Sequence, residues 1–247
     1  WHIADNMATA AGLMTDTTYT SRLLGSAWSP YGNKPIAEDM YENIKKVGLP
    51  TWSDDDQTLA KALQRELKVP VTGLASKIPE LRAPRAESTG GGDEGFGVGP
   101  TGGGSDDIGD VSWAVPTVRL SYPSNIPGGP GHNWADAISM ATPIAHKGVI
   151  AGAKVQAMTM IDILLHPELV QQAHDYFNNV QNKDMHYTTF LRPDDKPATW
   201  LNQKTMEQYR DKMKAFYYDP SKYDNYLDQL GIKYPTVRPA AATGSGN

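Results

Sequence analysis

The chain has 247 residues, a formal net charge of −5, 39% hydrophobic residues and no cysteine. This length fits one large domain or two small ones, and the acidic balance argues against a nucleic-acid partner, which needs a basic face to neutralise phosphates. The missing cysteines exclude a disulfide framework, a thiolate metal site and a cysteine nucleophile.

Neither a membrane partner nor a targeting segment is expected from the sequence. No unbroken apolar run reaches the roughly 18–20 residues that a membrane span needs, and no charged segment followed by an apolar core opens the chain. The first residue is Trp1 rather than Met. We therefore expect that the N-terminus was removed or that this is a piece of a longer chain, and the compartment, cytoplasmic or periplasmic, stays open.

The first fifty residues predict two helices and a strand. Residues 3–14 are rich in Ala and Met, which favours a short helix. Residues 16–24 carry several threonines and a tyrosine, which favour a strand. Asn33 is a good N-cap for a second helix, with Pro35 in its first turn and Gly48 as the residue that ends it.

A third helix and a long loop follow. Ser53 and Asp56 have the spacing of a capping box, and leucines at 59, 63 and 67 form one apolar stripe. Residues 68–105 are dominated by Pro, Gly and Ser and predict a long surface loop. Residues 97–102 match the GxGxxG pattern, but no strand precedes them, so we reject a nucleotide site there.

The central stretch, residues 102–154, holds most of the candidate chemistry. Residues 117–122 (TVRLSY) predict a strand, and a Pro/Gly-rich loop follows over 123–131. Thr142 and Pro143 are typical of a helix start, and this helix is expected to reach Leu165. Its first half is crowded with Gly and Ala, which would let it pack closely against a sheet.

The last eighty residues predict surface helices and a tail. An amphipathic helix should run from Pro167 to about Val180. Helices near 202–217 and 220–230 are rich in Tyr, Lys and Asp. The terminal sequence RPAAATGSGN predicts a disordered tail.

His132 is the first candidate for metal binding. It follows the sequence PGGPG in a stiff loop after a predicted strand, where a neutral imidazole is accessible and suited to zinc. The alternative is an ordinary loop histidine, and the pattern alone leaves both open. The chain has no HExxH, GxSxG or Walker motif.

Two further groups are candidates for substrate contact. His146 lies in the first turn of a predicted helix, where a structural or substrate-facing role is favoured over metal binding. Ser105, Asp106 and Asp107 follow three glycines, so exposed backbone N–H groups there are suited to holding a carboxylate. A capped helix start at Ser105 explains the same residues.

Three segments in order carry a resemblance to a known family. They are GGGSDDIGDVSWAVPTVRL, GPGHNWADA and TPIAHKGVIAGAKVQAMTMIDIL. They resemble the C-terminal half of the zinc-dependent aminoacylase and carboxypeptidase family, closest to its p-aminobenzoyl-glutamate hydrolase subgroup. The opening 44 residues are similar to the same subgroup, so that the resemblance covers roughly residues 1–200 and leaves 200–247 unplaced.

The resemblance implies an α/β fold, in which a central sheet flanked by helices forms the catalytic domain. Residues 1–24 would be the end of an α+β dimerisation lid, and residues 25–200 the C-terminal part of the catalytic domain. Residues 201–235 would be an additional helical extension, and 236–247 a disordered tail.

The resemblance also implies a site. Family members bind two divalent metal ions, here expected to be Zn with Mn or Co as alternatives, and His132 matches a metal-ligating histidine. Gly104, Ser105 and Asp107 match an element that lines the substrate pocket, and His146 matches a histidine typical of the subgroup. The family's other metal ligands and its catalytic glutamate lie upstream of residue 1, so the catalytic residue is not expected in this chain.

The activity implied is metal-dependent hydrolysis of the amide bond in N-acyl or N-aroyl amino acids such as p-aminobenzoyl-glutamate. The partners implied are that substrate, the missing N-terminal portion of the enzyme and a second copy joined through the lid. The alternative is a non-catalytic binding module that keeps the scaffold without a complete metal site.

Overall fold

The computed structural model describes residues 2–81 and 107–237, and every regular element in these ranges is a helix. The longer helices are α1 (His2–Thr15), α2 (Lys34–Val47), α3 (Asp54–Glu66), α4 (Asp107–Ala114), α5 (Trp134–Met140), α6 (Pro143–Leu165), α7 (Pro167–Tyr176), α8 (Gln203–Met213) and α9 (Tyr226–Gln229). Short π and 3₁₀ turns cover Phe177–Gln181, Thr199–Asn202 and Lys214–Phe216.

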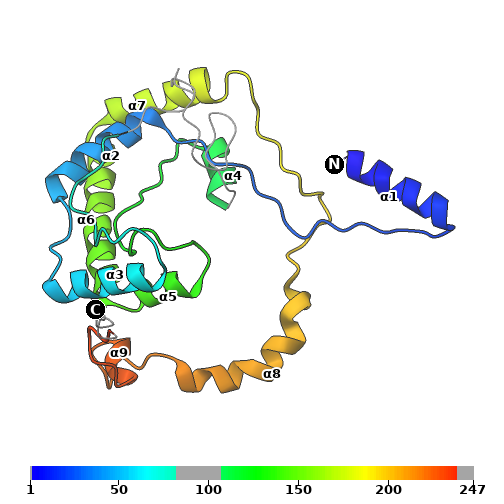
Figure 1. Ribbon diagram of the computed structural model, residues 1–247. Coiled ribbons are helices and arrows are strands. Elements are labelled where there is room, and N and C mark those ends of the chain that lie inside the picture. The colour runs from blue at the N-terminus through cyan, green and yellow to red at the C-terminus, as the bar shows by residue number, and fades with distance from the viewer. Residues whose placement is uncertain (1, 82–106, 238–247) are drawn as a thin grey trace, which may run out of the picture.

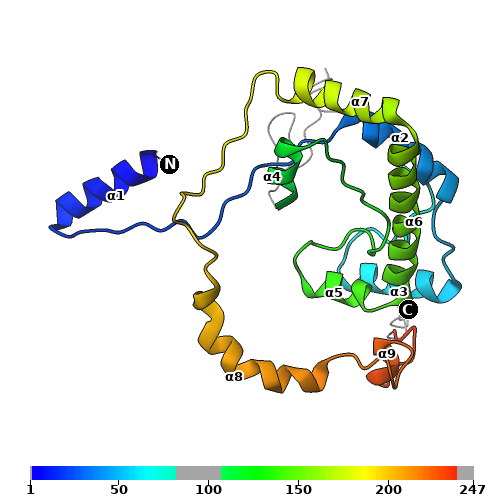
Figure 2. The same cartoon turned by 180° about the vertical axis from the view of Figure 1, so that it is seen from behind.

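Helix α6 is the central support of the molecule. It packs along α2 and connects α5 at one end to α7 at the other. Helices α3 and α5 gather around its first turns, and α2 and α7 around its last turns (Figure 1). Helix α1 stands away from this group in both views, and α8 follows a separate path to α9 (Figure 2).

The expected central sheet is wrong for the part of the chain that the structure describes, where no strand occurs. A strand is stable only when its backbone groups pair with a neighbouring strand. Within the described residues, the backbone of 117–122 is joined to other backbone by a hydrogen bond from the Asn33 N–H to the Thr117 carbonyl (2.8 Å). The segment is therefore extended without being part of a sheet.

The strand predicted over residues 16–24 is also wrong, and these residues have no regular structure. They fold back on α1 instead. The Thr17 N–H donates to the Gly12 carbonyl at 3.0 Å, and the Tyr19 hydroxyl lies 3.1 Å from that of Thr9. The β-forming side chains thus make local contacts with a helix.

Helix starts follow the predictions closely. Asn33 caps α2 by accepting from the Ile36 N–H, and Gly48 ends the helix with a φ of 72°. Ser53 and Asp56 form the predicted capping box of α3. Thr142 and Pro143 begin α6, although the Thr142 hydroxyl donates to the Ser139 carbonyl rather than capping the helix.

The C-terminal predictions hold in part. The helix from Pro167 becomes α7 followed by a π turn that ends at Gln181. The helix near 202–217 is present as α8 with a 3₁₀ turn at each end. The helix predicted over 220–230 shortens to α9, and the predicted tail over 238–247 lies outside the described residues.

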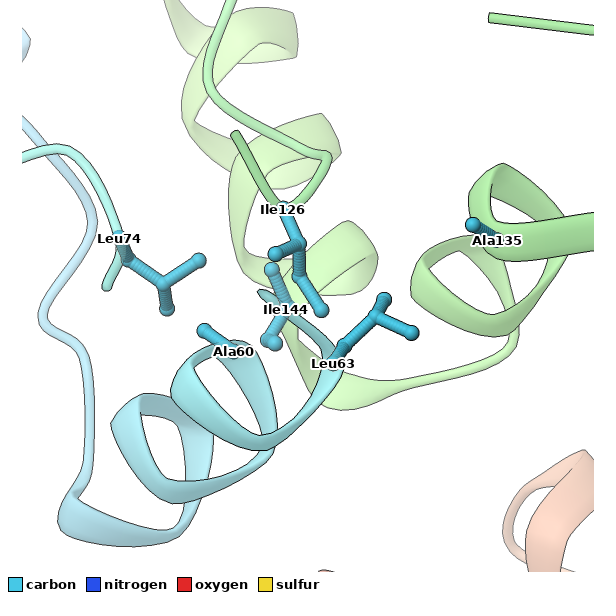
Figure 3. Close-up of a cluster of buried hydrophobic side chains, with 6 residues drawn as sticks. All are labelled: Ala60, Leu63, Leu74, Ile126, Ala135 and Ile144. Atoms are coloured by element: carbon cyan, nitrogen blue, oxygen red, sulfur yellow. The ribbon is translucent and has the colours of Figure 1, made fainter. Parts of the chain in front are cut away.

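An apolar core joins α3, α5 and the start of α6. Ala60 and Leu63 of α3 meet Ile144 of α6, whose side chain is fully buried (Figure 3). Leucines 59 and 67 of the predicted stripe pack at its edge, which confirms that α3 turns its leucines inward. The cluster consists of Ala60, Leu63, Leu74, Ile126, Ala135 and Ile144.

A buried carboxylate holds the same region together. Asp56 has no solvent-exposed side-chain surface, and it accepts hydrogen bonds from the Ser53 N–H (2.8 Å), the Lys147 ammonium (2.5 Å) and the Tyr234 hydroxyl (2.8 Å). Burial raises the pKa of Asp56, but these hydrogen bonds outweigh burial, so the pKa lies below its ordinary value. One side chain thus connects α3, α6 and the C-terminal segment.

The small residues of α6 permit a close approach of other backbone. A Cβ added to Gly148 would lie 2.1 Å from the Pro123 carbonyl oxygen and 2.6 Å from the Ser124 Cα. At Gly152 it would meet Tyr122 at 3.3 Å. The prediction of close packing therefore holds, but the partner is the extended segment over 122–124 and not a sheet.

Replacing Asp56 tests the buried carboxylate. We expect Asp56→Asn to lower the free energy of unfolding by about 2–3 kcal/mol, because it removes the charge opposite Lys147 and one of the two acceptor oxygens. Because the pKa of Asp56 is lowered in the folded state, its stabilisation is present above the ordinary value of 3.8 and is lost as pH falls through the lower folded value.

The measurement is urea unfolding between pH 2 and 7, with the neighbouring Asp55→Asn as the control. Asp55 is exposed and should change stability by less than about 0.5 kcal/mol. An equal effect of the two substitutions at pH 7 would contradict this account of Asp56.

Replacing Gly148 tests the close approach at α6. Alanine improves helix propensity by about 1 kcal/mol, yet we expect Gly148→Ala to destabilise by about 1–3 kcal/mol because its Cβ collides with backbone atoms. Gly32→Ala, where a Cβ meets no atom within 4 Å, is the control and should be nearly neutral. A Gly148→Ala variant that melts at or above the wild-type temperature would show that α6 does not pack against 123–124.

Candidate functional site

The loop that carries His132 is fixed at both ends. Upstream, Ile126 inserts into the core, and the side-chain amide of Gln64 donates to the Pro127 carbonyl at 3.0 Å. Downstream, Asn133 caps α5 by accepting from the Ala135 N–H at 3.0 Å. His132 therefore lies between two anchored points, as the sequence predicted.

Gln64 is a positioning residue that the sequence analysis did not identify. It is fully buried on α3, and its side chain accepts from the Gly73 N–H (2.8 Å) and donates to the Gly73 carbonyl (3.1 Å). With its third bond to Pro127, it joins α3 to two loops. In the sequence it is one of two glutamines on an amphipathic helix, so nothing there marks it.

His132 is exposed and has a φ of 56°, in the left-handed region that few residues other than Gly, Asn, Asp and His adopt. This conformation costs free energy, and positions of this kind are concentrated at functional sites. The carboxylate of Asp136 lies over the same loop, because its oxygens are 3.8 and 4.0 Å from Cβ atoms built on Gly129 and Gly131. Asp136, in the first turn of α5, is thus a polar group near this loop that the sequence analysis missed.

The other predicted site residues are not gathered around His132. Asp107 begins α4 and is exposed, and α4 lies toward α7 whereas α5 lies beside α3 (Figures 1 and 2). His146 is exposed in the first turn of α6. Gly104 and Ser105 lie outside the residues that the structure describes, as does Asp106 of the alternative helix start at Ser105.

Helix α4 is held by an aromatic cluster. The ring of Trp113 lies 5.5 Å from those of Trp28 and Tyr31, and Asp110 accepts from the Tyr187 hydroxyl at 2.8 Å and from the Trp28 N–H at 3.2 Å. These contacts fix the position of α4. The acid that the structure uses there is Asp110, while the predicted Asp107 faces solvent.

Metal-binding capacity within residues 2–81 and 107–237 is limited. No group of three or more His, Asp or Glu side chains in these ranges is arranged to hold an ion. His132, on its loop, and Asp136, in the first turn of α5, therefore do not form a complete metal site with other described residues.

An apolar cavity of about 350 Å³ lies between α5 and the C-terminal segment. Its size is in the range of small-molecule sites, and Trp134, two residues after His132, forms part of its wall. Tyr234 lines it and holds its hydroxyl on Asp56. The wall consists of Leu59, Trp134, Ala137, Ile138, Ala141, Thr142, Leu227, Leu230, Ile232, Tyr234 and Thr236.

Comparison with known proteins relates most of the chain to a hydrolase subunit. The chain is 29% identical over 203 residues to one of the subunits of p-aminobenzoyl-glutamate hydrolase from Escherichia coli (strain K12). The match covers 72% of this chain and 40% of that protein, so this chain spans less than half the length of the relative. No family model matches the sequence, and no solved structure matches it. The chain is therefore similar to part of a subunit of that hydrolase.

The strain at His132 can be measured directly. We expect His132→Gly to stabilise the chain or leave it unchanged, by up to about 1 kcal/mol, because glycine adopts the left-handed region without steric cost. His132→Val should destabilise it by about 1–2 kcal/mol, because a β-branched side chain is disfavoured there. Thermal unfolding of both variants gives the comparison, and a Val variant as stable as the Gly variant would refute the left-handed conformation.

Proposed function

We propose that this chain is part of a metal-dependent amidohydrolase that cleaves N-acyl or N-aroyl amino acids, with p-aminobenzoyl-glutamate as the model substrate. The observation that carries the proposal is the 29% identity over 203 residues to a subunit of p-aminobenzoyl-glutamate hydrolase. The three ordered sequence segments that contain Ser105, His132 and His146 carry the same resemblance.

His132 is the proposed metal ligand of this chain. His132 is exposed, so it is accessible, and its loop is anchored by Gln64 and Asn133. A zinc ligand is expected to be a neutral imidazole oriented by its surroundings. Two divalent ions, zinc or alternatively Mn or Co, would draw their remaining ligands and the glutamate base from polypeptide outside residues 1–247.

A divalent ion at such a site polarises the scissile carbonyl and lowers the pKa of a bound water. This chain's own contribution is to present an imidazole and to exclude water from part of the substrate. The apolar cavity behind Trp134 is suited to the uncharged aromatic end of an aroyl amino acid. The glycine-rich turn at 104–107 is proposed to hold the carboxylate end, and His146 to face the substrate.

A homodimer is part of the same proposal. Helix α1 stands away from the other helices and exposes Ile3, Met7, Leu13 and Met14, each at least 69% accessible. Contiguous exposed apolar side chains on one helix are typical of a surface that a partner covers. These residues support a contact between two copies through α1.

The test uses the natural polypeptide that contains this sequence. We expect the purified protein to contain zinc, manganese or cobalt and to release p-aminobenzoate from p-aminobenzoyl-glutamate. His132→Ala should lower both the metal content and kcat/KM, the latter by about 100-fold or more. The exposed His186→Ala is the matched control and should leave both unchanged.

Two results would contradict the proposal. If His132→Ala retains wild-type metal content, His132 is an ordinary loop histidine. If the metal-loaded natural protein hydrolyses neither p-aminobenzoyl-glutamate nor a panel of N-acyl amino acids, the chain belongs to a non-catalytic binding module.

A further inference from the structure

Helix α6 is apolar on two opposite sides. At 3.6 residues per turn, successive side chains are about 100° apart around the helix axis. The buried side faces α2, the core and the segment over 122–124. It consists of Ile144, Ala145, Gly148, Ala151, Gly152, Val155 and Thr159.

The opposite side is a continuous apolar surface that no described residue covers. Its large side chains are 53–78% exposed. Their spacing of three, four and seven places them on one strip, about 180° from the buried strip. We call this surface the outer stripe of α6: Val149, Ile150, Ala153, Ala157, Met160, Ile161 and Leu164.

A helix that is apolar on all sides is normally buried on all sides. Isolated exposed leucines need no explanation, but a contiguous apolar strip along most of a long helix indicates a covered surface. Ala153 and Ala157 lie in the middle of the outer stripe, between larger side chains. Small residues between larger ones leave room for bulky apolar side chains from an opposing element.

We propose that the outer stripe of α6 is the surface on which this chain docks with the further polypeptide of the hydrolase. The inference rests on the proposed function, because the occupant is identified from the relative, whose matched region is 40% of its length. The docking element is apolar in the middle, to match the outer stripe. At its margin it carries an acidic group opposite the exposed Lys154.

A membrane is the competing occupant, because α6 is long and apolar enough to cross a bilayer by length and composition alone. The core helix of a soluble protein passes the same test. The contacts of α6 favour a polypeptide. Lys147 of α6 forms an ion pair with the buried Asp56, and the helix also packs against α2, α5 and α7. Only one strip of α6 is therefore open to a partner within the described part of the chain.

Site-specific photocrosslinking in the natural polypeptide tests the proposal. A benzophenone amino acid replaces Met160 on the outer stripe, and in a control protein it replaces Phe216, which is 72% exposed outside α6. Crosslinked peptides are identified by mass spectrometry after irradiation in cells. We expect position 160 to react with hydrolase peptides that lie outside residues 1–247, and position 216 not to react with them.

Every other result at position 160 overturns the proposal. Reaction with a second copy of residues 1–247 would make the stripe a dimer surface, and reaction with lipid would place α6 at a membrane. No crosslink at all would mean that the stripe faces water. The readout does not depend on catalysis, so an inactive protein with the expected crosslinks refutes the proposed function alone.

A charge placed on the outer stripe gives a second measurement. Ile161→Lys in the natural polypeptide should reduce the Met160-position crosslink by about tenfold, because a lysine cannot be buried there without a partner. Gln156→Lys at the margin of the stripe is the control and should leave the crosslink yield unchanged. Equal yields from the two variants would contradict docking through the apolar strip.

Discussion

The buried carboxylate of Asp56 is the interaction on which the arrangement of the described helices depends. An ionised group without solvent contact is tolerated only when hydrogen bonds and a counter-charge replace its water. The Ser53 N–H donates a hydrogen bond from the start of the same helix. Lys147 of α6 and Tyr234 of the C-terminal segment donate the others from distant positions in the sequence. Because three elements are needed to satisfy one side chain, their relative placement is coupled. The apolar core around Ala60 and Ile144 joins the same two helices, α3 and α6, that the Asp56–Lys147 ion pair connects.

What the sequence predicted correctly is local. Caps at Asn33 and Ser53 and the start at Pro143 follow from hydrogen bonds over three or four residues, which a linear pattern contains. The strands over 16–24 and 117–122 were wrong because a strand requires a partner that no local pattern supplies. Tyr19 and Tyr122 have the residue type of a strand, yet each contacts a helix, one against α1 and the other against Gly152 of α6.

In the candidate site too, local features were predicted and contacts between distant residues were not. The position of His132 on a loop was predicted from the Pro/Gly-rich sequence before it, whereas α5 and its cap Asn133 were not predicted. The partners that fix that loop, Gln64 and Ile126, come from distant positions and have no distinctive pattern. The sequence analysis chose Asp107 because it follows three glycines. In the structure Asp110, three residues later on the same helix, accepts hydrogen bonds from Trp28 and Tyr187. The role of His132 in metal binding stays a prediction.

The two apolar sides of α6 connect these observations. A helix needs one apolar side to join the core, and α6 already has that side against α2 and the segment over 122–124. A second apolar side has no use in a helix that faces water, and in water it promotes aggregation. The presence of Ile150, Met160 and Leu164 there is explained when α6 lies between two layers of polypeptide.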